Sequence, residues 1–144
     1  MATLISTLTE SVRYRGREAQ WAFIFHRISG LATLLFLTIH ILDTSTVYFF
    51  PELYQHAIEI YRNPIFMLGE MALVAGVIYH GINGLRIIVF DLYPHLWTEE
   101  RQKAWFWIAF VGTIVLWLPA AFIMARALIY YNFGSTLLGL PGGA

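Results

Sequence analysis

Cysteine is absent from the 144 residues of this sequence. Its absence excludes disulfides, iron–sulfur ligation and thioether attachment of a haem within the chain. Charge is also scarce: 12% of the residues are charged, and nine Lys and Arg balance nine Asp and Glu. Without a basic excess, the composition does not indicate nucleic-acid binding. Apolar residues dominate instead, with 58% hydrophobic and 17% aromatic, and this composition is typical of a membrane protein.

Three stretches are long and apolar enough to cross a bilayer, which takes about 20 residues of helix. We expect spans at residues 21–48, 64–90 and 104–130. The chain is therefore predicted to be an all-α membrane protein with one transmembrane domain over residues 21–131. Residues 1–20 are predicted to form an N-terminal arm and residues 132–144 a loose tail. The connection at 49–63 is expected to carry a short amphipathic helix at the surface.

The placement of Lys and Arg predicts the orientation of the spans. Positive charge gathers on the side of the N-terminal arm and of the second connection, and only two Arg residues lie on the other side. The positive-inside rule then places the N-terminus in the cytoplasm, for a multi-pass protein of the inner (cytoplasmic) membrane. The cationic side holds Arg13, Arg15, Arg17, Arg27, Arg86, Arg101 and Lys103, and the other side holds Arg62 and Arg126.

The second span carries a single histidine, His80, within a run of small residues. Ala72, Gly76 and Gly84 are spaced from it in steps of four and share one helix face. An apolar groove with a neutral imidazole suits a b-type haem, with its iron on His80 and its propionates near a cation such as Arg86. The same stripe also fits a helix-packing face with a hydrogen-bonded histidine. This stretch by itself leaves both interpretations open.

The first span contains His26 and His40, which lie about 40° apart around the helix axis and about 21 Å apart along it. His40 and His80 differ too much in depth to ligate one iron from both sides. If both are ligands, they serve two haems whose other axial histidines come from a partner subunit, because the third span has no histidine. Glu70 and Asp43 are expected to meet His40 and to form a proton path, since ionisable groups at this depth are costly without a task.

Two segments, HRISG at 26–30 and HGINGLRIIVFD at 80–91, resemble the signature segments of the cytochrome b membrane-anchor subunit of succinate dehydrogenase. The resemblance covers roughly residues 13–130 in the same three-span order. It implies one half of a heterodimeric haem-binding helix bundle, in a complex with a second small anchor, an iron–sulfur subunit and a flavoprotein subunit. The chain would then hold no complete active site of its own, and the complex would transfer electrons between succinate and quinone.

The resemblance also implies roles for particular residues. His80 matches the haem ligand, and His26 with Arg27 matches the pair near the haem propionates and the quinone pocket. His40 is similar in placement to the distal-haem ligand of the two-haem members that react with menaquinone. We therefore expect two haems b, one at minimum, shared with the partner anchor, and menaquinone as the substrate.

One departure from the family and two other functions stay open at this point. Phe23 stands where members that use ubiquinone commonly have a serine, and Ser29 is a candidate substitute hydroxyl. The chain also fits a haem-free structural anchor of a fumarate reductase-like complex, or a small transporter subunit in which Glu70 and His40 relay protons. A one-haem version of the anchor would pair His40 with Glu70 by a hydrogen bond.

Overall fold

The computed structural model describes residues 6, 10 and 17–134. Three long helices, α2 (Arg17–Phe49), α4 (Pro64–Leu92) and α5 (Glu99–Phe133), are each long and apolar enough to cross a membrane. The shorter α3 (Pro51–Tyr61) and the 3₁₀ helix η1 (Pro94–Leu96) connect them. The described part of the chain contains no strand, so the predicted all-α fold is confirmed. Most of the predicted N-terminal arm and of the predicted tail lies outside the described residues.

The helix ends follow local sequence signals. The Asn63 side chain accepts a hydrogen bond from the Ile65 amide at 3.0 Å, and Pro64 takes the first position of α4. Proline suits this position because its missing N–H has no intrahelical partner there. Thr98 caps α5 in the same way through the Arg101 amide at 3.4 Å. The chain leaves α5 at Gly134, whose left-handed φ of 63° favours glycine.

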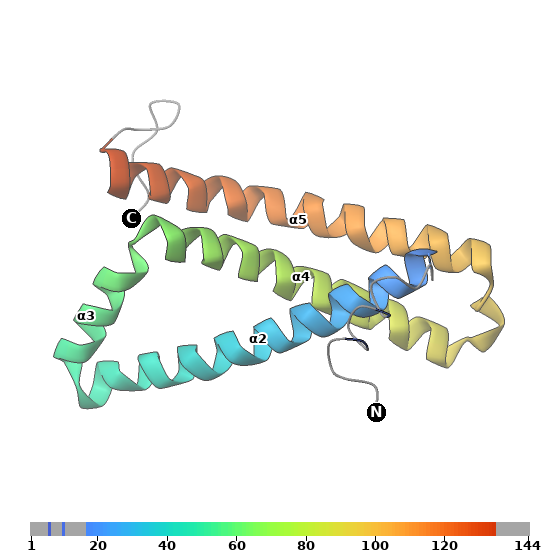
Figure 1. Ribbon diagram of the computed structural model, residues 1–144, viewed down its shortest axis with the longest axis horizontal. Helices are drawn as coiled ribbons and strands as arrows, with labels where there is room; N and C mark the ends of the chain where they lie inside the picture. The colour runs from blue at the N-terminus through green and yellow to red at the C-terminus, as the bar shows by residue number, and fades with distance from the viewer. Residues whose placement is uncertain (1–5, 7–9, 11–16, 135–144) are drawn as a thin grey trace.

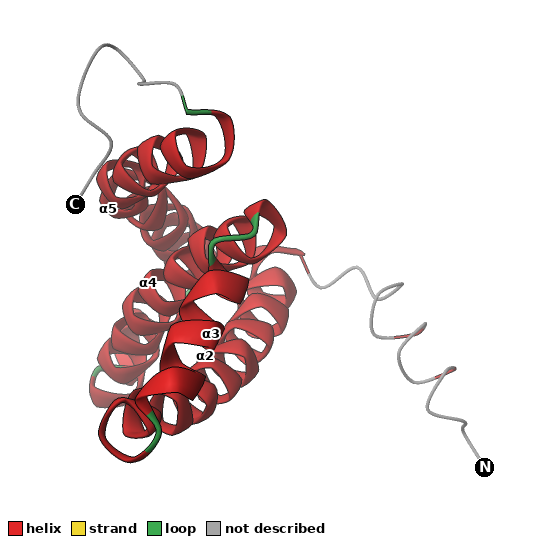
Figure 2. Cartoon of the chain, turned by 90° about the vertical axis from the view of Figure 1, so that its left-hand side faces the viewer, coloured by secondary structure: helices red, strands yellow, loops and turns green. Residues whose placement is uncertain are grey.

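The central helix is α4, which contacts α2 on one side and α5 on the other (Figures 1 and 2). The helices α2 and α4 meet near the start of α2, where Tyr79 lies against Ala22 and His80 against His26. Toward α3 the two helices separate, and α3 bridges their ends (Figure 1). An 11-residue helix is about 16 Å long, so α3 acts as a spacer that holds this end open.

Very little of the apolar surface is buried within the chain. In the most apolar stretch of each long helix, the share of residues buried inside the chain is 11% for α2, 6% for α4 and 17% for α5. Helix surfaces this apolar are stable only against lipid or against other membrane helices. The chain therefore presents most of its side chains to the bilayer or to partner subunits.

Candidate functional site

His80 is fixed against α2 by its Nδ1 atom. This nitrogen lies 3.1 Å from the carbonyl oxygen of His26 and 3.5 Å from the Ser29 hydroxyl. A carbonyl oxygen can only accept, so Nδ1 carries a proton, and in the neutral ring Nε2 then carries the lone pair. Within the described residues no group forms a hydrogen bond with Nε2. This tautomer is the one in which an imidazole offers Nε2 to a metal, with Nδ1–H oriented by a backbone carbonyl.

Two glycines define the space around the His80 ring. A Cβ atom at Gly30 would lie 2.8 Å from His80 Cε1, so only glycine lets the ring come this close to α2. Gly81, the next residue along α4, has open space where a side chain would lie. The ring is thus held closely against α2, and the open space lies at the next position of α4.

The stripe of small residues on α4 packs against α2. A Cβ atom at Gly76 would contact Ser29 Cβ at 3.8 Å, and one at Gly84 would contact His26 Cε1 at the same distance. The sequence leaves two interpretations open for this stripe, a haem groove and a helix-packing face. Gly76 and Gly84 take part in helix packing. The open glycine beside His80 is Gly81, which lies off the stripe.

His26 stacks on His80, with ring centroids 4.1 Å apart and the planes inclined by 7°. Two axial ligands of one haem lie on opposite faces of the macrocycle and point at each other through the iron. Rings stacked face to face lie side by side instead, so His26 and His80 cannot be the axial pair of one iron. The Nδ1 atom of His26 is buried and has no hydrogen-bond partner in the part of the chain that is described.

The two arginines of this end lie in different surroundings. Arg27 is exposed on α2, with its guanidinium 4.2 Å from the centroid of the Phe23 ring. Phe23 therefore serves as a cation–π platform for Arg27. Arg86 is 8% exposed and donates to the Asn83 side chain at 3.0 Å and to the backbone of α5. The structure thus places Arg27 next to His26 but turns Arg86 toward α5, away from the paired histidines.

Ser29 is buried at the same contact, at 7% exposure. Its hydroxyl donates to the His26 carbonyl oxygen at 3.1 Å, and Thr33 donates to the Ser29 carbonyl at 2.7 Å. The hydroxyl hydrogen of Ser29 is thus used within α2. Its location supports His80 and leaves no free donor for a quinone carbonyl.

A second polar cluster lies at the other end of the chain, where α2, α3 and α4 meet. The Tyr61 hydroxyl donates to a carboxylate oxygen of Asp43. This hydrogen bond to Asp43, followed by burial and by the charges of Asp43 and Glu70, raises the pKa of Tyr61 to about 12. Tyr61 therefore stays protonated at neutral pH and links α3 to α2, with Glu70 nearby on α4.

His40 stands apart from this cluster. It is exposed, and its ring stacks on Phe36 with centroids 5.4 Å apart. In the described residues no hydrogen bond joins His40 to Glu70 or to Asp43. The structure thus brings Asp43 and Glu70 close to Tyr61 and leaves His40 exposed on α2.

Three residues of these clusters are not singled out by sequence reasoning. Asn83, at 1% exposure, holds Arg86, and Gly30 makes room for the His80 ring. Tyr61 bonds Asp43 across 18 positions of chain. The sequence could have predicted the pairing of Asn83 with Arg86, because an amide three residues before an arginine on an apolar helix lies within its reach. It could not have predicted the contact of Tyr61, because the partner of Tyr61 depends on how α3 folds back.

No group of three or more His, Asp or Glu side chains that could hold a metal ion gathers in the described residues. A haem iron needs fewer protein ligands than such a metal ion. Four of its ligands are the macrocycle nitrogens, and the protein supplies only the axial ligands. His80, with a fixed tautomer and a free Nε2, meets that requirement. The donor set fits one axial ligand from this chain and a second from elsewhere.

Comparison with known proteins shows the family of the chain. A sequence profile described as the succinate dehydrogenase/fumarate reductase transmembrane subunit matches residues 7–120. The protein named succinate dehydrogenase 2 membrane subunit SdhC, from Mycobacterium tuberculosis, is 34% identical over 113 residues, covering 77% of this chain and 80% of the relative. A match over this length, together with three membrane-crossing helices, identifies a multi-pass membrane protein. The chain belongs to the family of succinate dehydrogenase/fumarate reductase transmembrane subunits.

Proposed function

We propose that this chain is the haem b-binding anchor of a succinate dehydrogenase and takes part in electron transfer between the iron–sulfur subunit and membrane quinone. The observation that carries the proposal is the state of His80: Nδ1 is held by the His26 carbonyl at 3.1 Å, and Nε2 is free. When bound, haem b supplies a one-electron redox centre between the two electron carriers. The flavin chemistry belongs to another subunit, and this chain contributes no complete active site.

Each residue of the cluster has a distinct task in this proposal. His80 would hold the haem iron through Nε2, and the His26 carbonyl fixes the orientation of the ring. Arg27, which is exposed beside His26 in the sequence, would offer a cation to a propionate or to the quinone head. A second small anchor, pairing with this chain into one helix bundle, would supply the other histidine that holds the haem. The iron–sulfur and flavoprotein subunits dock on the cytoplasmic side, near the start of α2.

We further propose a second haem on His40, with menaquinone as the electron acceptor. His40 is exposed about 21 Å along α2 from His26, so a ligand at this depth would come from outside the chain. Glu70 and Asp43, with Tyr61, would carry protons between the outer surface and this half of the chain. In the membrane the N-terminus faces the cytoplasm, and the membrane is the inner one.

The competing function is a haem-free structural anchor of a fumarate reductase-like complex. It is supported by the close packing of Gly76 and Gly84 against α2, because the histidines would then only stack and hydrogen-bond. The small-transporter alternative is less well supported, since its two relay groups, Glu70 and His40, share no hydrogen bond. Haem content separates the anchor functions directly.

The test is the variant His80→Ala in the purified complex, measured as reduced-minus-oxidised b-type absorption and as haem per flavin. Alanine has no nitrogen to occupy the axial position, so one b-haem signal should disappear while dye-linked succinate oxidation continues. His56→Ala, at an exposed histidine of α3, is the matched control and should keep the wild-type spectrum. Unchanged haem content in His80→Ala would falsify the proposal.

A further inference from the structure

The side chain of Arg27 is held by an aromatic ring of its own helix. Its guanidinium carbon Cζ lies over the ring of Phe23, 4.2 Å from the centroid. Phe23 stands four positions before Arg27, one turn nearer the start of α2. Side chains on a helix lean toward its N-terminus, so an arginine reaches a ring four positions before it more closely than one four positions after it. Arg86 and Phe90 stand in the opposite order on α4, and their distance is 5.5 Å.

This contact leaves the hydrogen-bond donors of Arg27 free. A cation over an aromatic ring is attracted by the face of the ring, which occupies none of the five N–H donors of a guanidinium. Among the described residues, Arg27 finds no hydrogen-bond acceptor and no carboxylate. Arg86 instead donates to the Asn83 side chain at 3.0 Å and to the Gln102 carbonyl at 3.4 Å. Of these two arginines, Arg27 is the one that keeps its planar fork of donors for an oxygen from outside the chain.

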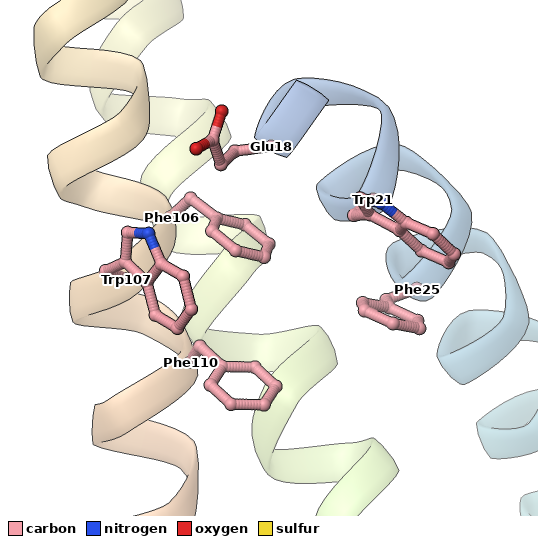
Figure 3. Close-up of a pocket in the computed structure, with 6 residues that line it drawn as sticks. All are labelled: Glu18, Trp21, Phe25, Phe106, Trp107 and Phe110. Carbon is pink, nitrogen blue, oxygen red and sulfur yellow. The ribbon is translucent and has the colours of Figure 1, made fainter. Parts of the chain in front are cut away.

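The pair of Phe23 and Arg27 lies on the side of α2 that is turned away from α5. Trp21 and Phe25 line a pocket between α2 and α5 (Figure 3). Two positions along a helix correspond to a turn of about 200°, so Phe23 lies nearly opposite both of them. Arg27 follows His26, which lies against α4, by about 100° around the axis. The pair therefore flanks the contact of α2 with α4 and lies outside the pocket.

The ring of Phe23 also sets the depth of the positive charge. Along the helix axis Phe23 lies about 3 Å from Trp21, and Arg27 lies about 6 Å further in. Tryptophan is enriched at the headgroup level of a bilayer, so a guanidinium held over Phe23 lies close to that level. Under the proposed function, on which this step rests, electrons arrive from the cytoplasmic side. A quinone head that receives them would lie near the same level.

We propose that Phe23 is a positioning residue of the quinone site. It holds the Arg27 guanidinium near the headgroup level, with the N–H edge free to donate to a quinone carbonyl oxygen. Arg27 contacts the substrate, and Phe23 acts through Arg27. Without the ring, the arginine side chain samples more rotamers, and ordering it when quinone binds costs conformational entropy. The loss is therefore expected in the KM for quinone and not in kcat.

The experiment measures succinate oxidation by the purified complex with a short-chain naphthoquinone as acceptor. Phe23→Leu keeps an apolar side chain but removes the ring, and Phe23 is 54% exposed, so the fold tolerates the change. The KM should rise about twofold to fivefold, which corresponds to an exposed cation–π contact. Phe23→Trp retains a ring and should retain the wild-type KM. Phe49→Leu is the matched control, because Phe49 is 68% exposed at the far end of α2.

A double variant separates positioning from a merely structural role. If Phe23 acts through Arg27, then Phe23→Leu should add nothing to the KM in the Arg27→Leu background, whereas independent effects would multiply. The dye-linked rate and the haem-to-flavin ratio are recorded for every sample and should not change in Phe23→Leu. The haem midpoint potential is recorded as well, because it responds to a cation at a propionate.

An unchanged KM in Phe23→Leu, an equal rise in Phe49→Leu, or a further rise in the Arg27→Leu background overturns the proposal. A shifted haem midpoint with an unchanged KM also overturns it, because Arg27 would then serve a propionate. A normal KM in Arg27→Leu refutes the quinone role of Arg27 itself, and a raised KM in Arg27→Leu alone refutes only the role of Phe23. A complex without haem that shows the expected KM values refutes the haem function and leaves the quinone site standing.

Discussion

At the scale of single residues, the tightest packing at the candidate haem site is between Gly30 and the His80 ring. A Cβ atom at position 30 would lie 2.8 Å from His80 Cε1 and 3.1 Å from Nδ1. The ring has little room to retreat, because it stacks on His26 and is bonded to the His26 carbonyl. Overpacking of this kind costs about 1–3 kcal/mol. Position 30 thus controls where the Nε2 atom of His80 points.

We predict that Gly30→Ala lowers the haem-to-flavin ratio or shifts the b-type absorption bands, since the added methyl group displaces the proposed ligand. Haem per flavin and the reduced-minus-oxidised spectrum measure the effect. Gly112→Ala is the control, because a Cβ atom there meets only Ile82 Cδ1 at 3.8 Å, an ordinary contact. A normal spectrum and ratio in Gly30→Ala would mean that the position of His80 is not set by α2.

Tyr61 is the residue whose removal should loosen the opposite end of the chain. In Tyr61→Phe the hydrogen bond to Asp43 is lost, and because the site is partly exposed we expect a cost of about 1 kcal/mol or less. The expected result is faster amide exchange in α3, measured by mass spectrometry. Tyr54→Phe is the control on the same helix, since no hydrogen bond involves the Tyr54 hydroxyl within the described residues.

The pH dependence of this contact follows from the raised pKa of Tyr61. A group whose folded-state pKa lies above its unfolded value of about 10 stabilises the folded state fully below that value. This contribution is lost as the pH rises through about 12. The difference in the stability of α3 between the wild type and Tyr61→Phe, obtained from the protection of its amides against exchange, should therefore be constant from pH 7 to pH 9. A difference that vanishes within this range would contradict the assignment.

Sequence reasoning could find residues of the candidate site but not their contacts. His80, His26 and Arg27 stand out because ionisable groups are rare in apolar helices. Their depth follows from counting residues, yet the stacking of the two rings and the turn of Arg86 toward α5 depend on helix rotation. The pairing of Asp43 with Tyr61 depends on the return path of α3. A span that is apolar on nearly every side gives no sequence signal for its rotation about the helix axis.

At the scale of helices, the sequence predicted the elements well. The predicted spans at 21–48, 64–90 and 104–130 correspond to α2, α4 and α5, and the predicted short surface helix is α3. Each observed helix extends beyond the predicted span at one end or both, since helices continue into the polar interface until a cap ends them. The separation of α2 from α4 toward α3 was not predictable, because it is set by packing at the other end.

The separation of these two helices gives His40 its environment, and from it a prediction. Since His40 is exposed on α2, a second haem bound there would have to be completed by the partner anchor. We expect two haems per flavin in the wild-type complex and one in His40→Ala, with the signal that depends on His80 retained. One haem in both samples would eliminate the second haem and leave His40 as a residue that stacks on Phe36.

At the scale of the whole molecule, the charges of the chain predict its orientation in the membrane. By the bounds of the helices, the cations near the start of α2 and the end of α4 are Arg27, Arg86, Arg101 and Lys103, and those near the α3 end are Arg62 and Arg126. Lys and Arg near short connections favour the cytoplasmic side. The candidate haem ligand His80 lies in the cationic half, on the side where the iron–sulfur subunit would dock. The proposed electron entry and the positive-inside rule thus predict the same orientation.

The absence of cysteine makes this orientation directly measurable, because any thiol label on this chain must report an introduced residue. Gln55→Cys on α3 and His95→Cys in η1 place single thiols at exposed positions on the two sides. A membrane-impermeant maleimide should label Gln55→Cys in intact cells and His95→Cys only in inverted vesicles, with both labelled after denaturation. The reverse pattern would place the N-terminus outside. It would also separate the candidate haem site from the cytoplasmic side, where the proposed electron donor lies, so the labelling tests the proposed electron path as well as the topology.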